Sequence, residues 1–403
     1  MHRNFRACGK AILLALLVAS ACTESSINQA STPVARPLAS GTNIVVYGSE
    51  GPILRQYTLD LSTGQLAAGS SVSFPAGVQY AAIARKADHL YVSAGNQPLN
   101  SQLFAFDIAP GSGALSPRGA PLAPSGGRSI NLSVNHQGTH LALAHSSANR
   151  AAIVELAADG SMVGEVPPIG ATATGPFPHQ AKFDHAGQNL IVPGLALNGG
   201  DGTLTVFGFG EGQLTHTQTV TLAPVLGARH VEFDHSGRFV YLAVERGNRL
   251  HTYRFADGLL SATPIFDGTT LADQLNNLLA RQRAGAIHAH PSAPFLYLSN
   301  RQDMLDGNAL PGENNIAVFA LDVATGEPTP IQHIDTGGVE ARSFTIDPTG
   351  QYLIVGNQVA RTVNGVVIPP SLAVFRIGAD GKLSFLHKYV VGGEVFWVGS
   401  VAL

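Results

Sequence analysis

The sequence predicts an all-β fold: a seven-bladed β-propeller whose ring is closed by strands from both ends of the chain. One supporting observation is a hairpin repeat of about fifty residues that occurs in six complete copies. A further copy is split between the two ends of the chain. The composition agrees, because 45 glycines, 24 prolines and only 13% charged residues favour strands and tight turns over helices.

Each complete copy consists of eight residues, one turn residue and eight more. The copies span residues 79–95, 130–146, 179–195, 229–245, 285–301 and 342–358. Their turn residues lie 49 to 57 residues apart and are Ala87, Gly138, Gly187, Gly237, Ala293 and Gly350. Apolar residues alternate with polar ones inside a copy, as Val231 and Phe233 do, which indicates strands with two distinct faces. A four-stranded unit that repeats every 40–50 residues or so is typical of a propeller.

Further strands complete each repeat. A third strand ending in an aromatic residue is predicted at residues 103–106, 204–207, 250–253, 316–319 and 372–375. A weaker fourth strand follows a turn that contains glycine, such as Thr325–Gly326. Residues 42–50 match the second half of a copy and residues 397–403 match the first half. A blade shared in this way leaves no open edge between the first and last blades. A solenoid is the alternative fold, but solenoids use shorter repeats and need end caps.

One stretch departs from the repeat. In residues 270–283, Leu271, Leu275, Leu278 and Leu279 fall at helical spacing, which predicts a short helix before the fifth copy. The helix would be a packing insert or, alternatively, a lid over a site.

The N-terminal residues have the pattern of an export signal. Arg3, Arg6 and Lys10 precede a nine-residue apolar run at 11–19, which is too short to span a membrane as a helix. The following Ala19-Ser20-Ala21-Cys22 resembles the lipobox of bacterial lipoproteins, with Ala19 where that motif usually has Leu. This resemblance implies a signal peptide over residues 1–22 and a lipid on Cys22. Because Thr23 rather than an acidic residue follows, it implies the periplasmic face of the outer membrane. The alternative is a secreted protein cleaved nearby.

Cysteine usage and charge restrict the other possibilities. The cysteines are Cys8 and Cys22, so a mature chain that begins at Cys22 has no disulfide and no cysteine metal site. Residues 23–40 are rich in Ser, Thr, Ala and Pro and are predicted to be a flexible tether before a propeller over 41–403. The net charge of −3 gives no basic field for nucleic acid. We expect a monomer that contacts the membrane only through its lipid.

The repeat register predicts a site. Equivalent positions in successive blades lie around one axis, and a hairpin brings its two ends to the same edge of the sheet. The residues eight before and eight after each turn residue should therefore converge, and the ionisable ones are His179, Arg229, Arg342, Glu50, Glu245 and Arg301. Such a cluster can bind an anion and move protons. The alternative is a set of ion pairs that only join adjacent blades.

Four segments carry a resemblance to a known family. Pro178-His179, Arg229-His230, Glu245 and Ser299-Asn300-Arg301, together with the hairpin repeats, resemble the lactonase-type propellers. That family includes bacterial 6-phosphogluconolactonase and the fungal carboxy-cis,cis-muconate lactonizing enzyme. In the muconate enzyme a His, two Arg and a Glu form the proposed active site. Here Val244 stands where the family usually has Asn, and the insert before Gly285 and the loop over 360–370 are long.

The resemblance implies a hydrolase or cyclase that acts on a sugar or carboxylic acid lactone without cofactor or metal. Glu245 and His179 would be catalytic, one of them as the general base that activates water, and Arg229 and Arg301 would bind a small anionic or lactone substrate. The register adds Arg342 and Glu50 to the substrate-binding residues. The alternative is a non-catalytic envelope propeller that binds a ligand or a protein, because propellers host many functions. His288 and His290 could bind a metal, but His290 occupies a turn position, and a turn role is preferred.

Overall fold

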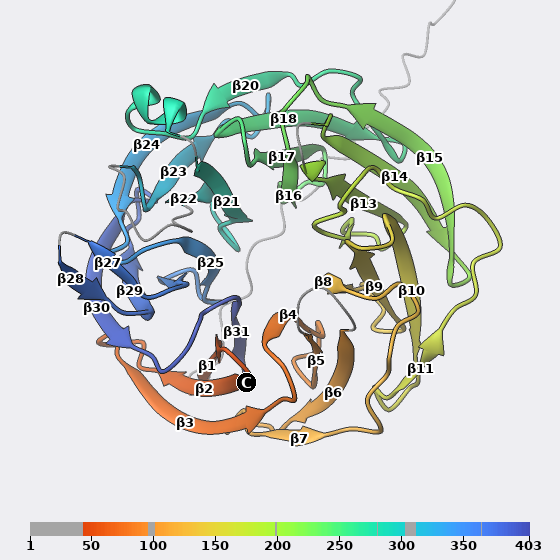
Figure 1. Cartoon of the computed structure of the whole chain (residues 1–403), viewed down its shortest axis with the longest axis horizontal. Helices are drawn as coiled ribbons and strands as arrows, with labels where there is room; N and C mark the ends of the chain where they lie inside the picture. The colour runs from red at the N-terminus through yellow and green to blue at the C-terminus, as the bar shows by residue number, and fades with distance from the viewer. Residues whose placement is uncertain (1–42, 96–100, 198–199, 280, 303–311, 364) are drawn as a thin grey trace, which may run out of the picture. The chain divides into compact units, whose positions relative to one another are not determined.

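Seven antiparallel sheets follow one another around a ring in the computed structural model (Figure 1). The structure describes residues 43–95, 101–197, 200–279, 281–302, 312–363 and 365–403. The predicted leader, its Cys22 and the predicted tether lie outside these ranges. The first strand of each blade contacts the neighbouring blades, and the contacts continue around the ring from β4 to β31 and back to β4. The predicted seven-bladed propeller is confirmed.

The blades follow the predicted repeat closely. The first blade consists of β4 (Val78–Ile83), β5 (His89–Ala94), β6 (Gln102–Ile108) and β7 (Leu115–Pro117). The second consists of β8 (Ser129–Val134), β9 (His140–His145), β10 (Arg150–Leu156) and β11 (Met162–Glu165). The third consists of β12 (Lys182–Phe183), β13 (Asn189–Gly194), β14 (Thr203–Gly210) and β15 (Gln213–Thr221). The next is β16 (Ala228–Phe233), β17 (Phe239–Val244), β18 (Arg249–Ala256) and β19 (Leu259–Leu260), with β20 (Phe266–Thr269) also paired to β18. The last complete blades are β21 (Gln282–Ala289), β22 (Phe295–Gln302), β23 (Asn315–Leu321) and β24 (Pro328–Asp335); and β25 (Ala341–Ile346), β26 (Tyr352–Asn357), β29 (Ser371–Ile377) and β30 (Leu383–Val390). A separate hairpin pairs β27 (Arg361–Val363) with β28 (Val366–Ile368).

Both ends of the chain share the seventh blade, as predicted. Its sheet has the order β3 (Leu66–Ser73), β2 (Ile53–Leu59), β1 (Ile44–Glu50) and β31 (Val398–Ala402). The antiparallel register joins Ile44 to Ala402 and Gly48 to Val398. Trp397 is buried in the apolar cluster between this blade and the blade that begins with β4. The C-terminal strand therefore closes the ring.

The turn residues adopt the backbone conformation that a tight hairpin needs. Ala87, Gly138, Gly187, Gly237 and Gly350 all have positive φ angles, between 60° and 73°. Ala293 does not adopt a positive φ angle, and its hairpin is organised differently. There the Nδ1 atom of His290 accepts hydrogen bonds from the Ser292 and Ala293 amides. His290 thus takes the place of the Asp found in three of the other turns, which confirms the preferred turn role.

A recurrent tyrosine links neighbouring blades. Tyr91, Tyr241 and Tyr297 lie four residues after their turn residues and are almost fully buried. Their hydroxyls donate to the carbonyls of Gly160, Gly326 and Gly381, which belong to outer turns of the next blade, at 2.9, 3.2 and 2.8 Å. Each bond satisfies a buried hydroxyl and fixes one blade against the next.

Residues 270–283 form much less helix than the leucine spacing predicts. The helix is one 3₁₀ turn, η2 (Gln274–Leu278), and β21 already begins at Gln282. Leu275 and Leu278 are 70% and 82% exposed, so the leucines do not form a buried face. The segment is held instead by the Glu313 carboxylate, which accepts from the amides of Ala272 and Asp273 at 2.9 Å. Among the residues that the structure describes, no helix is long and apolar enough to cross a membrane.

Candidate active site

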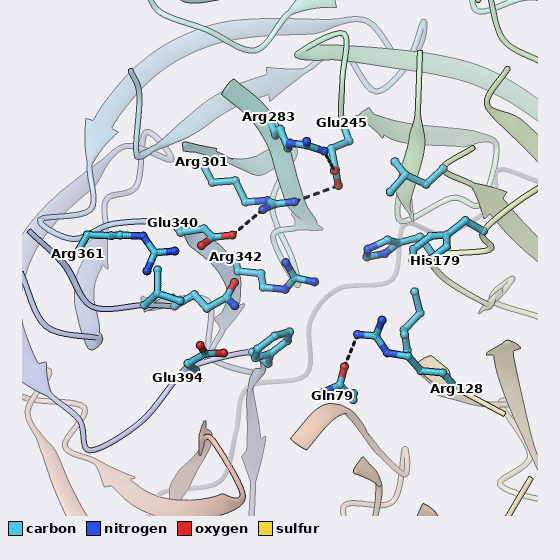
Figure 2. Close-up of a pocket in the computed structure, with 16 residues that line it drawn as sticks. Gln79, Arg128, His179, Glu245, Arg283, Arg301, Glu340, Arg342, Arg361 and Glu394 are labelled. Carbon is cyan, nitrogen blue, oxygen red and sulfur yellow. Dashed lines mark hydrogen bonds and ion pairs between the residues drawn. The ribbon is translucent and has the colours of Figure 1, made fainter. Parts of the chain in front are cut away.

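A polar cavity of about 340 Å³ lies where the ends of the inner hairpins meet (Figure 2). All seven blades contribute residues to its lining. The lining contains five arginines and three glutamates, namely Arg128, Arg283, Arg301, Arg342, Arg361, Glu245, Glu340 and Glu394. This excess of positive charge favours an anionic ligand. We call this space the arginine-rich cavity.

β-Bulges direct side chains into this region. The pairing of β4 with β5, β8 with β9, β16 with β17 and β25 with β26 shifts register at one residue in each first strand. The residues left unpaired are Gln79, Ile130, Arg229 and Arg342, which all lie eight residues before the turn. A bulge turns an extra residue out of the ladder and re-aims its side chain, and bulges often lie beside active sites. The repeat therefore encodes a ring of re-aimed residues.

Glu245 is the centre of a charged cluster. Its carboxylate lies 2.9 Å from Arg229 Nε, 2.9 Å from Arg283 Nη1 and 3.2 Å from Arg301 Nη2. Arg301 continues the network, because its Nη1 donates to Glu340 at 2.9 Å. Figure 2 shows Arg283 and Arg301 converging on Glu245 from the next blade. The network thus joins three consecutive blades.

The surrounding guanidinium groups determine the protonation of Glu245. Burial by itself raises the pKa of this carboxyl, but the charges of Arg301, Arg229 and Arg283 outweigh burial and bring the pKa below its ordinary value. Glu245 is therefore ionised throughout the physiological pH range. A carboxylate held so firmly in its charged form accepts a proton poorly, which favours a role in positioning the arginines over a role as general base.

His179 points toward the middle of the cavity (Figure 2). Its Nδ1 atom lies 3.2 Å from Nε2 of His230, which belongs to the next blade and lies behind it. Burial, followed by the charge of Arg229, lowers the pKa of His179 well below its ordinary value. His179 is therefore a neutral imidazole at neutral pH, able to form a hydrogen bond with a bound ligand.

Arg128 and Arg342 differ from Arg283 and Arg301, because neither forms an ion pair with a carboxylate in the described ranges. Arg128 donates to the neutral side chain of Gln79 at 2.7 Å. The Arg342 guanidinium lies over the Phe396 ring, 4.7 Å from its centroid. Burial, and then the charge of Arg301, lowers the pKa of Arg342 to about 10, so it is still charged at neutral pH. These two groups can bind an anion without first breaking an ion pair.

The structure brings four of the six residues predicted from the register to the cavity wall. His179, Glu245, Arg301 and Arg342 line it. Arg229 does not; it is only 2% exposed and lies behind Glu245, where its side chain cannot meet a ligand directly.

Glu50 also lies away from the cavity lining. It accepts hydrogen bonds from Arg55 Nε at 2.8 Å and from the Tyr57 hydroxyl at 2.7 Å, both on the adjacent strand of its own blade. The amide of Gly392 lies 3.4 Å from the other carboxylate oxygen. These contacts secure the shared blade, and substrate binding by Glu50 stays a prediction.

Four further lining residues lie outside the set that the repeat register predicts. Arg128, Phe177, Arg283 and Glu340 all lie ten residues before their turn residues, two positions ahead of the predicted set. The shared offset is visible in the repeat alignment, so the repeat itself contained this signal. Phe177 and Glu340 have φ angles of 54° and 58°, which are uncommon for residues other than glycine and occur often at functional sites. Arg361, Glu394 and Phe396 lie outside the six repeats and could not be found in this way.

His288 belongs to a second polar cluster. Glu232 lies 2.8 Å from Lys182 Nζ and 3.4 Å from His288 Nδ1. Burial by itself raises the pKa of Glu232, but contacts with Lys182 and His288 outweigh burial and lower the pKa to about 2. The described residues contain no group of three or more His, Cys, Asp or Glu side chains arranged to hold a metal ion. His288 thus contacts Glu232 of the preceding blade.

The architecture and the cavity define a seven-bladed propeller with a polar, arginine-rich site at the ends of its inner hairpins. Comparison with known sequences identifies the group more narrowly. The pattern of the family described as "Lactonase, 7-bladed beta-propeller" matches residues 42–399, and the chain belongs to this family. The chain is 28% identical to the 6-phosphogluconolactonase of Serratia proteamaculans over 344 residues, which cover 84% of this chain and 93% of that protein. It is likewise 28% identical to the 6-phosphogluconolactonase of Yersinia pestis over 350 residues, which cover 84% and 91%.

Solved structures share the fold. The periplasmic gluconolactonase of Pseudomonas aeruginosa superposes with a TM-score of 0.71 at 23% identity, covering 88% of this chain and 97% of that one. A protein from Lactobacillus plantarum gives a TM-score of 0.72 at 22% identity, covering 89% and 99%. These likenesses confirm the propeller architecture, and the family assignment makes this chain a lactonase-type propeller.

Proposed function

We propose that this protein hydrolyses the lactone of a sugar acid in the arginine-rich cavity and prefers a lactone that carries a carboxylate or phosphate. One observation carries the proposal: His179, Glu245 and Arg301 of the family motif lie together in a cavity. The cavity also contains two arginines that pair with no carboxylate among the described residues. The names of the relatives, 6-phosphogluconolactonase and gluconolactonase, support the same substrate class.

The cavity offers groups that can bind an anion and groups that can stabilise an oxyanion. Arg128 and Arg342 would bind the anionic substituent of the substrate. Arg301 and the His179 ring would stabilise the negative charge that develops on the carbonyl oxygen when water attacks the carbonyl carbon. The ring C–O bond then breaks, a proton from the attacking water passes to the leaving ring oxygen, and the product is a hydroxy acid. Because guanidinium groups supply the positive charge, we propose a reaction that requires no metal.

A lactone panel tests this function. Purified protein would be given glucono-δ-lactone, its 6-phosphate and muconolactone, and acid release would be titrated at constant pH against the spontaneous rate. We expect turnover of about 1 s⁻¹ or faster on at least one of them, unchanged by EDTA. Saturable binding of these compounds without turnover would instead support the non-catalytic alternative. If the protein neither binds nor hydrolyses any of these lactones, the proposed substrate class is refuted.

We further propose that the protein is exported and anchored to the outer membrane, facing the periplasm, through a lipid on Cys22. The motivation is the charged start, the short apolar run and the small residues that precede this cysteine. The name of the periplasmic Pseudomonas gluconolactonase agrees with an exported lactonase.

A Cys22→Ala variant is expected to lose the anchor. Metabolic labelling with a fatty-acid analogue should mark the wild-type protein in the membrane fraction, whereas the variant should carry no label. Cys8→Ala is the matched control, because Cys8 lies within the predicted leader and its replacement should leave labelling intact. An unlabelled, soluble wild-type protein would contradict the anchor.

A further inference from the structure

Two histidines from neighbouring blades form a directed pair beside the arginine-rich cavity. His179 Nδ1 and His230 Nε2 lie 3.2 Å apart, and the two ring centroids are separated by 5.1 Å. Each residue is 7% exposed. His179 lines the cavity, whereas His230 is not part of the lining, so any effect of His230 on a ligand must pass through His179.

The neighbour on the far side of His230 fixes the direction of this hydrogen bond. Arg229 Nη1 lies 3.1 Å from His230 Nδ1, the nearer of the two ring nitrogens. An arginine side chain has only donors. The Arg229 guanidinium is itself held by Glu245 and almost completely buried, so it stays in place and charged. The same Nη1 lies 3.4 Å from His230 Nε2, and the shorter contact makes His230 Nδ1 the acceptor.

The protonation of both rings follows from this contact. Burial lowers the pKa of both His179 and His230 well below the ordinary value, so each ring is neutral and carries one proton. Since His230 accepts at Nδ1, its proton is on Nε2 and is donated to His179 Nδ1. His179 must then carry its own proton on Nε2, the only other ring nitrogen.

We propose that His230 is a positioning residue that holds His179 as its Nε2–H tautomer, so that His179 donates a hydrogen bond to the reacting oxygen of the substrate instead of accepting a proton from water. The chain of contacts runs from Glu245 through Arg229 and His230 to His179 and so connects the charged cluster to the cavity. A neutral imidazole N–H can polarise a carbonyl and stabilise an oxyanion. The inferred role rests on the proposed lactonase function, but the tautomer does not.

The tautomer can be measured without any substrate. Protein labelled with ¹⁵N-histidine would be studied at pH 7 by long-range ¹H–¹⁵N correlation, which distinguishes protonated from unprotonated ring nitrogens. His179→Gln and His230→Gln spectra would assign the two rings by difference. We expect an unprotonated Nδ1 and a protonated Nε2 in both. A protonated Nδ1 on His179, or an imidazolium on either residue, would overturn the proposal.

Kinetics with two replacements of His230 tests the consequence. A glutamine can accept from Arg229 through its amide oxygen and donate to His179 through its amide nitrogen, whereas a phenylalanine keeps the ring shape and can do neither. We expect His230→Phe to lower kcat roughly 10- to 100-fold with KM changed less than about threefold, and His230→Gln to restore most of the loss. Equal losses in both variants, or no loss in either, would contradict positioning. If the wild-type protein hydrolyses no lactone, the proposed function fails, but the spectra still decide the tautomer.

Discussion

A chain that ends at Phe396 is expected not to fold. The deletion removes β31, which pairs with β1 over residues Val398–Ala402 and completes the shared blade. It also removes the buried side chains of Trp397, Val398 and Val401. Loss of a buried Trp alone typically costs about 3–5 kcal/mol, and the total stability of a domain is only about 5–15 kcal/mol. We expect no cooperative thermal transition by circular dichroism.

A chain that begins at Gly41 provides the control for this deletion. It lacks the predicted leader and tether but keeps all of β1, so its melting temperature should equal that of the mature protein. Trp397 is the only tryptophan in the sequence, so its fluorescence reports directly on the closed blade in both full-length and N-terminally shortened chains. Cooperative melting of the chain that ends at Phe396, near the wild-type temperature, would show that β31 does not close the ring.

Glu245→Gln is expected to destabilise the protein strongly and to reduce turnover as well. The carboxylate compensates three arginines, two of which, Arg229 and Arg301, are nearly fully buried. Removing the partner of a buried charge costs about 3–5 kcal/mol, so the melting temperature should fall by several degrees. Turnover should fall because Arg301 and the Arg229–His230–His179 contacts lose their fixed geometry.

Glu394→Gln is the matched control, because Glu394 lines the same cavity but is exposed. Its melting temperature should remain at the wild-type value. A Glu245→Gln protein that melts like wild type but has lost turnover would indicate that Glu245 acts as the base after all. A Glu245→Gln protein that is destabilised but keeps normal turnover per folded molecule would show that Glu245 has no role in catalysis.

The fold could be predicted because its determinants are local and repeated. A strand-turn-strand pattern with a fixed turn residue recurs six times, and the half copies at residues 42–50 and 397–403 specify which strands must meet. The insert at residues 270–283 was harder, since leucines at helical spacing look alike whether or not a neighbour covers them. There Leu275 and Leu278 remain exposed and Glu313 holds the backbone by hydrogen bonds from a distant part of the chain.

The site could be predicted only in part. The repeat register gives the position of a residue along its strand but not the direction in which its side chain points. Arg342 and Arg229 occupy the same bulged position, yet one faces the cavity and the other turns toward Glu245. Glu50 lies at the same repeat position as Glu245, but Arg55 and Tyr57 on the next strand donate hydrogen bonds to its carboxylate. Such choices depend on which partner lies nearest in space, and a repeat alignment does not contain that information.

If a lactone with an anionic group is hydrolysed in the arginine-rich cavity, Arg342→Gln should weaken its binding. Steady-state hydrolysis of glucono-δ-lactone and its 6-phosphate would be compared in wild type, in this variant and in Arg254→Gln, which alters an exposed arginine on β18. A lost charged hydrogen bond of about 1.5–3 kcal/mol should raise KM for the phosphorylated lactone roughly 10- to 100-fold. KM for the neutral lactone should change less than about threefold, and Arg254→Gln should match wild type on both. If Arg342→Gln leaves KM for the phosphorylated lactone unchanged, the cavity is not where that anion binds.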